Sequence, residues 1–348
     1  MSQSYQIFPT DAAKSHLSPT FLNNLHLKTT PIPTPGPNSV LLRIRAVSLN
    51  YRDLLIVANS PLYPVSAVPG LIPCCDGAGE IVSVGENSKW ASNIGASVIV
   101  HPTHSWIDGN VSNYDFATTR GMGDIQGLLA QYVVIEDEWI VLGPKNLSFE
   151  EMASLPCAGA TAVNVLSSVN VEKGTTVVTQ GTGGVSCFVI QFASALGATV
   201  ISTSSSAAKL AIAQKLGATH LINYNTSPSW SEDILRLTDN RGVDLVADVG
   251  GSGTIGETIK SLRQGGTACC IGFLAPPKEV DVVFDLMFKA RTLKGVICFS
   301  RKMVEDMVVL VEEHDIHPPI EVYEWEDAKK AFEIYRDQKV VGKVVIKV

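Results

Sequence analysis

The chain has 348 residues, and this length predicts two domains, because single hydrophobic cores stop growing at roughly 250–300 residues. Its composition, 45% hydrophobic and 18% charged, is that of a globular protein, and its net charge of −7 argues against nucleic acid, whose binders carry a basic face. Neither a secretory signal nor an apolar run of membrane-spanning length is visible in the sequence. We therefore expect a cytoplasmic protein with reduced thiols.

Residues 1–140 have the pattern of a mostly β domain. Runs rich in β-branched residues alternate with turns that contain Gly, Pro and Asn. We predict strands at residues 40–49, 79–85, 96–101 and 130–136. The polar, glycine-dotted stretch 102–129 predicts a long loop, and loops of that length often line a site.

From about residue 147 the pattern changes to alternating strands and helices. Ser148 followed by Glu151 forms a capping-box pattern, which predicts a helix over 148–169. Short apolar strands between helices predict βαβ units and a parallel sheet covered on both faces. The predicted strands are 175–180, 199–204, 220–224, 243–251 and 266–273, and the tail adds helices at 302–314 and 326–338 and a strand at 342–348.

The stretch QGTGGVS, Gln180–Ser186, lies directly between a buried strand and a helix. Gly181, Gly183 and Gly184 would let the backbone approach a pyrophosphate at the helix N-terminus. The strict G-x-G-x-x-G spacing is not met, because Ser186 replaces the last glycine. The order of strand, glycines, helix and second strand nevertheless favours a dinucleotide site over an ordinary tight turn.

The next strand ends at Ser204 and Ser205, and Lys209 follows, with no acid among them. An NAD site usually has Asp or Glu at this point to bind the ribose 2′-hydroxyl. Hydroxyls and a lysine suit a 2′-phosphate, so NADP(H) is favoured over NAD(H). The alternative is a polar helix N-cap beside a solvated lysine.

Seven segments, in order, resemble the medium-chain dehydrogenase/reductase superfamily, and in particular its zinc-lacking alcohol dehydrogenase-like and quinone oxidoreductase-like branch. The segments are SLNYRDLLI, DGAGEIVSVGE, LPCAGATA, QGTGGVS, KLGATHLINY, VDLVADVGG and GKVVIKV. The resemblance implies an α/β protein in which residues 1–154 and 301–348 form a GroES-like, mostly-β catalytic domain. A Rossmann domain with a doubly wound parallel sheet would occupy residues 155–300. The resemblance also implies a homodimer that pairs through the strand in 292–299.

The resemblance bears on a metal site as well. In zinc-dependent relatives the metal ligands are Cys, His and Cys, and the matching residues here are Asn50, Cys75 and Cys157. Asn is a poor zinc ligand beside thiolate or imidazole, and two cysteines do not complete a tetrahedral site. Conceivable substitutes are Asp76, His101 and His104, although a packed turn and two loop histidines explain them more simply. The sequence therefore predicts no metal.

The chemistry that remains is hydride delivery from a reduced nicotinamide to an activated acceptor, since an ordinary alcohol would lose the metal that supports its alkoxide. Such acceptors are quinones, enones, enoyl thioesters and aldehydes. The catalytic candidates are Tyr63, Tyr51 and Asn50. Tyr63 falls where enoyl reductases of the superfamily place a proton-transferring tyrosine, and a packing role is an equal alternative. Tyr51 stands where zinc relatives have a histidine.

Further roles follow from the resemblance. Asn50 would lie near the nicotinamide ribose and Thr161 would line the nicotinamide pocket. Tyr224 would join Ser205 and Lys209 around the 2′-phosphate. Lys343 is either a contact to the cofactor phosphates or a solvated edge-strand lysine. The cofactor-binding residues that we expect are Asn50, Thr161, Gly181, Thr182, Gly183, Gly184, Val185, Ser204, Ser205, Lys209, Tyr224, Gly250, Gly272, Phe273 and Lys343.

The sequence thus predicts a zinc-independent, NADPH-dependent oxidoreductase that acts on a small molecule. A metal-free NADP-dependent alcohol dehydrogenase and a non-catalytic NADPH-binding protein are the alternatives. Arg52 and Asp53, beside the catalytic candidates, are expected to form a structural ion pair.

Overall fold

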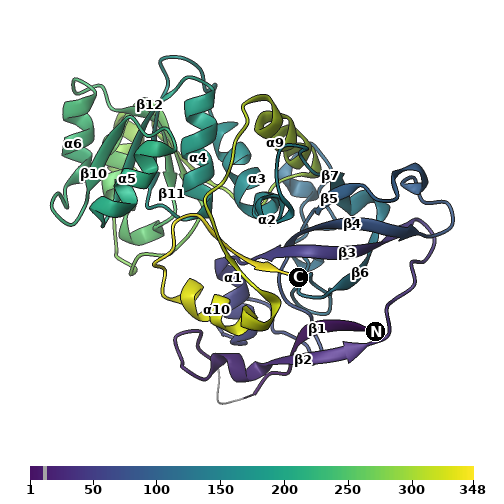
Figure 1. Cartoon of the computed structure of the whole chain (residues 1–348). Helices are drawn as coiled ribbons and strands as arrows, with labels where there is room; N and C mark the ends of the chain where they lie inside the picture. The colour runs from purple at the N-terminus through teal and green to yellow at the C-terminus, as the bar shows by residue number, and fades with distance from the viewer. Residues whose placement is uncertain (11–13) are drawn as a thin grey trace. The chain divides into compact units, whose positions relative to one another are not determined.

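The computed structural model describes residues 1–10 and 14–348 and is drawn in Figure 1. The chain divides into two compact units. We call Met1–Cys157 together with Phe299–Val348 the split unit, and Ala158–Cys298 the inserted unit. None of the helices in the described part of the chain has the length and apolarity needed to cross a bilayer.

Over its described residues, the split unit is built on a mixed, mostly antiparallel sheet of seven strands in the order β14-β15-β3-β4-β5-β7, with β6 also paired to β3. The last strand of the chain lies antiparallel to β3, and Figure 1 shows it in yellow beside that strand. A separate two-stranded sheet joins β1 and β2. The strands are β1 (Ser2–Ile7), β2 (Leu25–Thr30), β3 (Ser39–Ser48), β4 (Asp76–Val84), β5 (Ser97–Val100), β6 (Tyr132–Glu136), β7 (Ile140–Leu142), β14 (Ile320–Tyr323) and β15 (Lys343–Lys347).

The core of the split unit forms because β3 buries apolar side chains such as Val40, Leu42 and Ile44. The amphipathic helix α10 adds Ala331 and Phe332 to the same core and leaves its lysines exposed. The helices of the split unit are α1 (Tyr51–Val57), α2 (Phe149–Ala153), α9 (Arg301–Glu313) and α10 (Ala328–Arg336), and α3 (Leu155–Leu166) includes the boundary between the units.

The inserted unit, described in full, contains a parallel sheet of six strands in the order β10-β9-β8-β11-β12-β13. Numbered within the unit, this order is 3-2-1-4-5-6, the doubly wound Rossmann topology. The strand order reverses between β8 and β11, and in such sheets ligands bind outside the carboxyl ends at this point. The strands are β8 (Thr176–Gln180), β9 (Thr199–Ser204), β10 (His220–Asn223), β11 (Val243–Asp248), β12 (Leu262–Cys270) and β13 (Thr292–Gly295), and the helices are α4 (Gly184–Ala195), α5 (Ala207–Lys215), α6 (Trp230–Leu237), α7 (Ile255–Ser261) and α8 (Val283–Phe288).

The fold class predicted from the sequence is confirmed, including the mostly-β domain and the parallel Rossmann sheet. The helix predicted over 148–169 was wrong in extent, since the chain forms α2 and α3 with Ser154 at the break between them. Its start was right: Ser148 and Glu151 form the capping box, with Glu151 N donating to Ser148 Oγ at 3.2 Å. The loop 102–129 carries only 3-10 turns and isolated bridges.

Candidate active site

The turn between β8 and α4 is open on its outer side. Gly181 has φ +68°, a conformation that favours glycine. A Cβ atom added at Gly181 or Gly183 would meet no described atom within 4 Å, so both glycines border free space at the N-terminus of α4. Ser186 does not continue the glycine motif, because its hydroxyl donates to Gln180 O at 2.7 Å and ties the helix to the strand. Free space beside the first amides of a helix, which have no partner within the helix, fits a pyrophosphate.

The other predicted residues of this turn occupy the start of the helix. Gly184 and Val185 are the first two residues of α4. Thr182 is buried, and its carbonyl accepts from Cys187 Sγ at 3.4 Å. The backbone of this segment is thus held by the helix itself, independently of any ligand.

The sequence analysis missed a buried carboxylate at the place where the strand order reverses between β8 and β11. Asp248, at the end of β11, is fully buried and accepts hydrogen bonds from Gly250 N at 3.0 Å and Gly251 N at 2.8 Å. It also accepts from Thr254 Oγ1 at 2.8 Å and from Gln180 Nε2 at 3.0 Å. The network ties the carboxyl ends of β8 and β11 together. The sequence did contain a signal for it, since Asp248 ends an apolar strand and stands shortly before Gly250 and Gly251.

Close packing explains two more of the predicted glycines. A Cβ at Gly250 would lie 2.4 Å from Thr254 Oγ1, and one at Gly272 would lie 2.8 Å from Val249 O. Phe273, which follows, is 63% exposed, and Thr161 on α3 is buried. All four residues lie in the inserted unit. Gly250 follows the carboxyl end of β11, and Gly272 and Phe273 follow that of β12.

The residues predicted to bind a 2′-phosphate gather at the ends of β9 and β10. Tyr224 N donates to Ser204 O at 3.1 Å, so the strand ends meet there. Ser205 and the Tyr224 side chain are exposed. Lys209 lies in the first turn of α5, where its backbone N–H is capped by the Ser206 hydroxyl. The serine cap of the alternative interpretation is therefore present beside the hydroxyls and the lysine.

A second polar cluster lies in the split unit, around Asn50. Lys343 Nζ donates to Asn50 Oδ1 at 2.6 Å and to Leu49 O at 2.7 Å, and lies 3.5 Å from Asp76 Oδ2. Asn50 Nδ2 donates to the same carboxylate oxygen at 2.9 Å. Only 2% of Lys343 is exposed, so its interpretation as a solvated edge-strand lysine was wrong.

Asp53 does not form the ion pair with Arg52 that the sequence suggested. Its Oδ2 accepts from Asn50 N at 2.8 Å, and its Oδ1 has no partner among the described residues. Burial raises the pKa of Asp53 to about 6, against the opposing effect of the Arg52 charge. Burial also raises the pKa of Asp76, and Lys343 opposes that rise.

The residues that match the zinc ligands of relatives do not fit a metal ion. Asn50 Oδ1 accepts from the Lys343 ammonium, and Asp76 Oδ1 accepts from Cys157 N at 3.1 Å. Burial raises the pKa of the Cys75 thiol well above its usual range, and a thiol is not a ligand until it is ionised. In the described ranges, no three His, Cys, Asp or Glu side chains are grouped to hold a metal.

The two candidate tyrosines belong to different hydrogen-bonded groups. The Tyr63 hydroxyl accepts from Arg52 Nε at 3.0 Å and donates to Met122 Sδ at 3.6 Å. Burial raises its pKa to about 12, and the Arg52 charge opposes this. The Tyr51 hydroxyl lies 3.2 Å from His16 Nε2, and burial raises its pKa too.

The two loop histidines pack among aromatic rings. His101 Nδ1 lies 2.8 Å from Thr103 O, and the His104 ring stacks on Trp139 with centroids 5.2 Å apart. Burial lowers the pKa of both histidines to about 4. They are therefore neutral side chains of the loop core at neutral pH.

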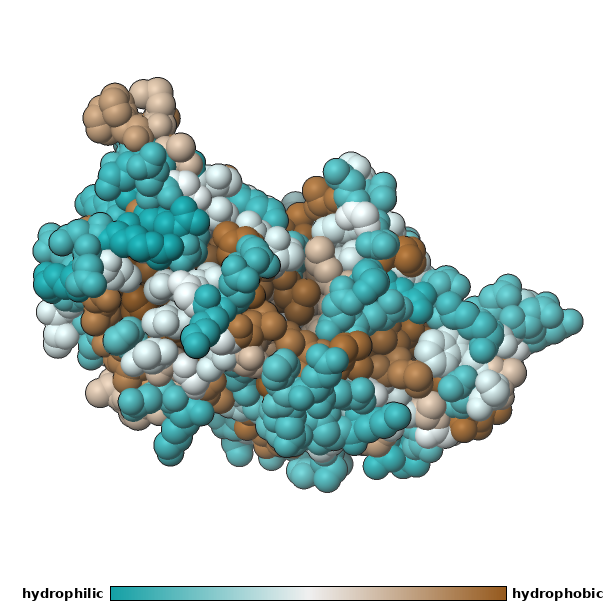
Figure 2. Space-filling view, turned by 90° about the horizontal axis from the view of Figure 1, so that it is seen from above, coloured by the Kyte–Doolittle hydropathy of each residue, from teal (hydrophilic) through white to brown (hydrophobic). Residues whose placement is uncertain are grey.

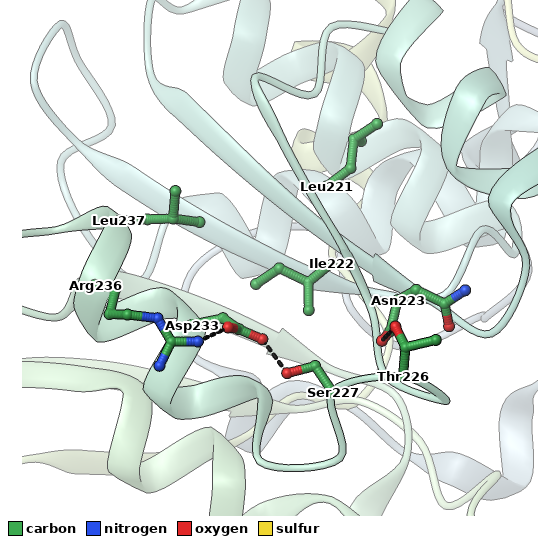
Figure 3. A pocket seen from close by; sticks show the side chains of 8 residues that line it. All are labelled: Leu221, Ile222, Asn223, Thr226, Ser227, Asp233, Arg236 and Leu237. Carbon is green, nitrogen blue, oxygen red and sulfur yellow. Dashed lines mark hydrogen bonds and ion pairs between the residues drawn. The ribbon is translucent and has the colours of Figure 1, made fainter.

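A hollow of about 360 Å³ lies elsewhere on the inserted unit, between β10 and α6. Figure 3 shows Leu221, Ile222 and Leu237 on its apolar side and the hydrogen-bonded Ser227, Asp233 and Arg236 facing them. The structure describes all of the predicted site residues, and none of them lines this hollow. It is therefore separate from the glycine turn.

A doubly wound sheet with a glycine turn at its centre is typical of proteins that bind a dinucleotide. Comparison with known proteins agrees: residues 36–145 match the alcohol dehydrogenase GroES-like domain, and residues 184–313 match the zinc-binding dehydrogenase domain. A zinc-type alcohol dehydrogenase-like protein of Schizosaccharomyces pombe is 40% identical over 90% of this chain and 92% of its own length. The chain belongs to the medium-chain dehydrogenase/reductase superfamily, whose members use nicotinamide dinucleotides.

Solved structures agree with this assignment. A protein of Sinorhizobium meliloti 1021 assigned as an alcohol dehydrogenase superposes with a TM-score of 0.89 and 32% identity, over 100% of this chain and 98% of its own. A quinone oxidoreductase of Pseudomonas syringae pv. tomato DC3000 gives a TM-score of 0.80 over the whole of both chains. At 23% identity, this second similarity bears on the fold alone.

Proposed function

We propose that this oxidoreductase is zinc-independent and uses NADPH to reduce an activated double bond or carbonyl. The observation that carries the proposal is the position of the Lys343 ammonium, 2.6 Å from Asn50 Oδ1. Asn50 matches the first zinc ligand of metal-dependent relatives, so a fixed side-chain cation contacts the residue where they have a metal ligand. An acceptor that is already activated does not require a Lewis acid, whereas alkoxide formation from a simple alcohol is strongly helped by one.

The bound cofactor supplies the hydride, and the residues of the inserted unit hold it. The amides at the start of α4, beside Gly181 and Gly183, bind the pyrophosphate. Ser205, Lys209 and Tyr224 bind the 2′-phosphate, since a lysine and hydroxyls complement its charge and its acceptor oxygens. The absence of an acid at Ser204–Lys209 favours NADPH over NADH.

The residues of the split unit supply the proton and the orientation. Tyr63 is the first candidate for the proton donor, because its hydroxyl is held by Arg52. Tyr51, beside His16, is the second. Asn50 is held between Lys343 and Asp76 and orients the first turn of α1.

The proposal is tested by mixing the protein with NADPH or NADH and a panel of quinones, enones, enoyl thioesters and aldehydes, and following the loss of nicotinamide absorbance. Consumption of NADPH in preference to NADH is expected. Elemental analysis of protein purified without added metal should find zinc far below one atom per chain. Near-stoichiometric zinc, or a preference for NADH, would contradict the corresponding part of the proposal.

A metal-free NADP-dependent alcohol dehydrogenase is the second candidate, favoured by the similarity to the S. pombe protein. It predicts reversible oxidation of alcohols by NADP⁺. A non-catalytic protein predicts tight NADPH binding with no turnover of any acceptor or alcohol. The same panel, extended by alcohols and NADP⁺, separates these possibilities.

A homodimer is proposed as the working assembly. β13 forms one edge of the parallel sheet, and Leu293 on it is 38% exposed. The four apolar residues of α8 that follow its helical repeat are each more than 60% exposed: Val283, Phe284, Met287 and Phe288. Figure 2 shows apolar side chains in brown among the polar ones on the face in view. A second copy of the chain would bury Leu293 and these apolar residues of α8, and its β13 would pair with the β13 edge of the first copy. Light scattering of the wild type and of Leu293→Lys tests this, and a monomeric wild type contradicts it.

A further inference from the structure

Arg52 is a cation that has hydrogen bonds but no paired carboxylate. Its Nε donates to the Tyr63 hydroxyl at 3.0 Å and its Nη1 donates to Arg120 O at 2.9 Å. Its Nη2 is buried without a partner among the described residues. No carboxylate of the described residues lies within ion-pair distance of it, although Asp53 is its neighbour in sequence. A buried guanidinium usually pairs with an anion, so an anion that forms only at intervals would explain the arrangement.

Cys75 and Tyr63 are the two neutral groups next to Arg52 that could become that anion. Burial raises the pKa of the Cys75 thiol well above its usual range, whereas the Tyr63 oxygen accepts directly from Arg52 Nε, so Tyr63 is the better placed. Since arginine only donates, the Tyr63 oxygen must accept the bond from Nε, and the phenol proton must point elsewhere. It points to Met122 Sδ at 3.6 Å, and a thioether is a weak acceptor. The phenol proton therefore makes only a weak hydrogen bond, while the phenol oxygen accepts a charge-assisted hydrogen bond from Arg52. The guanidinium carbon also lies 5.7 Å from the centre of the Tyr63 ring.

We infer that Arg52 is a positioning residue for Tyr63, holding the phenol oxygen and stabilising the phenolate that forms when Tyr63 gives up its proton. The inference rests on the proposed function. Bound NADPH would supply a hydride that forms a C–H bond at the β-carbon of an enone, which would leave an enolate and the oxidised cofactor. The Tyr63 O–H bond then breaks, its proton forms the second C–H bond at the α-carbon, and the phenolate is reprotonated by water.

The charged and titratable groups around the pair act in opposite directions. Burial raises the pKa of Tyr63 and Arg52 lowers it, while the Cys75 and Asp53 side chains raise it. Burial keeps Cys75 in its thiol form at neutral pH, so Asp53 is the competing negative charge. Without Arg52, every remaining influence would favour the neutral phenol.

The test separates charge from hydrogen bonding at position 52. Arg52→Lys keeps the charge, and Arg52→Gln keeps a donor without the charge. With NADPH and cyclohexenone, Tyr63→Phe should lower kcat at least 100-fold, within the usual range for losing a general acid. Arg52→Gln should lower kcat at least 10-fold, and Arg52→Lys should retain more activity than Arg52→Gln. The KM for NADPH should stay within about twofold, since neither residue is assigned to the cofactor.

Two further comparisons exclude a merely structural role. The double variant Arg52→Gln/Tyr63→Phe should be no slower than Tyr63→Phe alone, because Arg52 acts through Tyr63. The control Arg45→Gln removes a side chain that is 37% exposed and pairs with Glu80, and it should leave kcat unchanged. Arg52→Gln with the kcat of the wild type, or additive losses in the double variant, would overturn the inference.

A readout that needs no turnover distinguishes this inference from the proposed function. The protein is labelled with carbon-13 at the ζ position of its tyrosines. The NMR signal that disappears in Tyr63→Phe belongs to Tyr63, and its chemical shift reports whether that phenol is ionised. Its titration should begin at higher pH in Arg52→Gln than in Arg52→Lys. An unchanged titration overturns the inference. If the titration shifts while no acceptor is reduced, the coupling stands and the proposed function fails.

Discussion

The Nζ atom of Lys343 lies 2.6 Å from the side-chain oxygen of Asn50, 293 residues away in the sequence. The same ammonium lies 3.5 Å from the buried Asp76 carboxylate. Three buried polar side chains thus compensate one another at the start of α1. A charge in this position has large effects when its partner is removed, because water cannot replace the lost interaction.

Lys343→Met is therefore expected to lower the free energy of unfolding by about 3–5 kcal/mol, the cost of leaving a buried charge unpaired. Urea unfolding followed by tryptophan fluorescence measures the loss. The matched control is Lys347→Met on the same strand, whose side chain is 51% exposed and lies 4.0 Å from Glu150. That control should change stability by less than about 1 kcal/mol. Equal losses in the two variants would show that the buried Asp76 carboxylate does not depend on the charge of Lys343.

Gly183→Ala should abolish NADPH binding while leaving the fold intact. Gly183 has φ −74°, which alanine adopts without strain, and the added methyl group would meet no described atom within 4 Å. It would instead fill the space that the pyrophosphate needs. Quenching of tryptophan fluorescence by NADPH measures binding, and the melting temperature reports the fold.

Gly181→Ala is the counterpart of that variant. At φ +68° an alanine costs about 1–2 kcal/mol, so this variant should lose stability. If Gly183→Ala bound NADPH as tightly as the wild type, the turn would not be the pyrophosphate site.

Lys209→Gln should raise the KM for NADPH roughly tenfold or more and leave that for NADH unchanged, because a charge-assisted hydrogen bond contributes about 1.5–3 kcal/mol. Steady-state kinetics with both cofactors gives the ratio. Lys215→Gln, at the other end of α5, is the control. Equal effects on NADPH and NADH would remove Lys209 from the 2′-phosphate site.

Acidification should weaken the fold through His101. Its folded pKa of about 4 lies below the unfolded value of about 6.5. The unfolded chain therefore binds the proton first, and the stabilising contribution, complete above pH 6.5, is lost as the pH falls towards 4. The gap between the two values corresponds to at most about 3 kcal/mol. Asp53, with a raised pKa of about 6, acts in the opposite direction, since protonation stabilises its folded form.

A variant isolates the histidine from Asp53. His101→Asn keeps a donor for Thr103 O and removes the titration. Urea unfolding at pH 7 and pH 5 should show a smaller loss of stability in this variant than in the wild type. The same loss in both proteins would show that His101 is not responsible.

Local pattern was enough to predict most of the fold. The apolar runs of β8, β9 and β11 and the glycines between β8 and α4 are short-range signals, and they specified the parallel sheet. The split between α2 and α3 was missed because the apolar repeat continues across Ser154. The seven-residue helix α1 was missed because it is too short to show a repeat.

The polar partners in the candidate site were harder to predict, because they depend on contacts distant in sequence. Alternation along β15 places Lys343 and Lys347 on the same face, yet one is buried and the other is half exposed. The difference is that Asn50, Leu49 O and Asp76 lie beside the first of them. Arg52 was paired with Asp53 on adjacency, whereas its guanidinium reaches Tyr63, eleven residues further on.

The pairing of β15 with β3 imposes an order on synthesis. The inserted unit is one continuous segment, so it can fold as soon as residue 298 has left the ribosome. The split unit is complete only when Lys343 arrives, because residues 46–48 of β3 pair with β15 and Asn50 accepts from Lys343, whereas β4 and β6 can pair with β3 earlier. During that interval residues 46–48 of β3 and the Asp76 carboxylate lack their partners from β15, and unpaired strand edges are prone to aggregation.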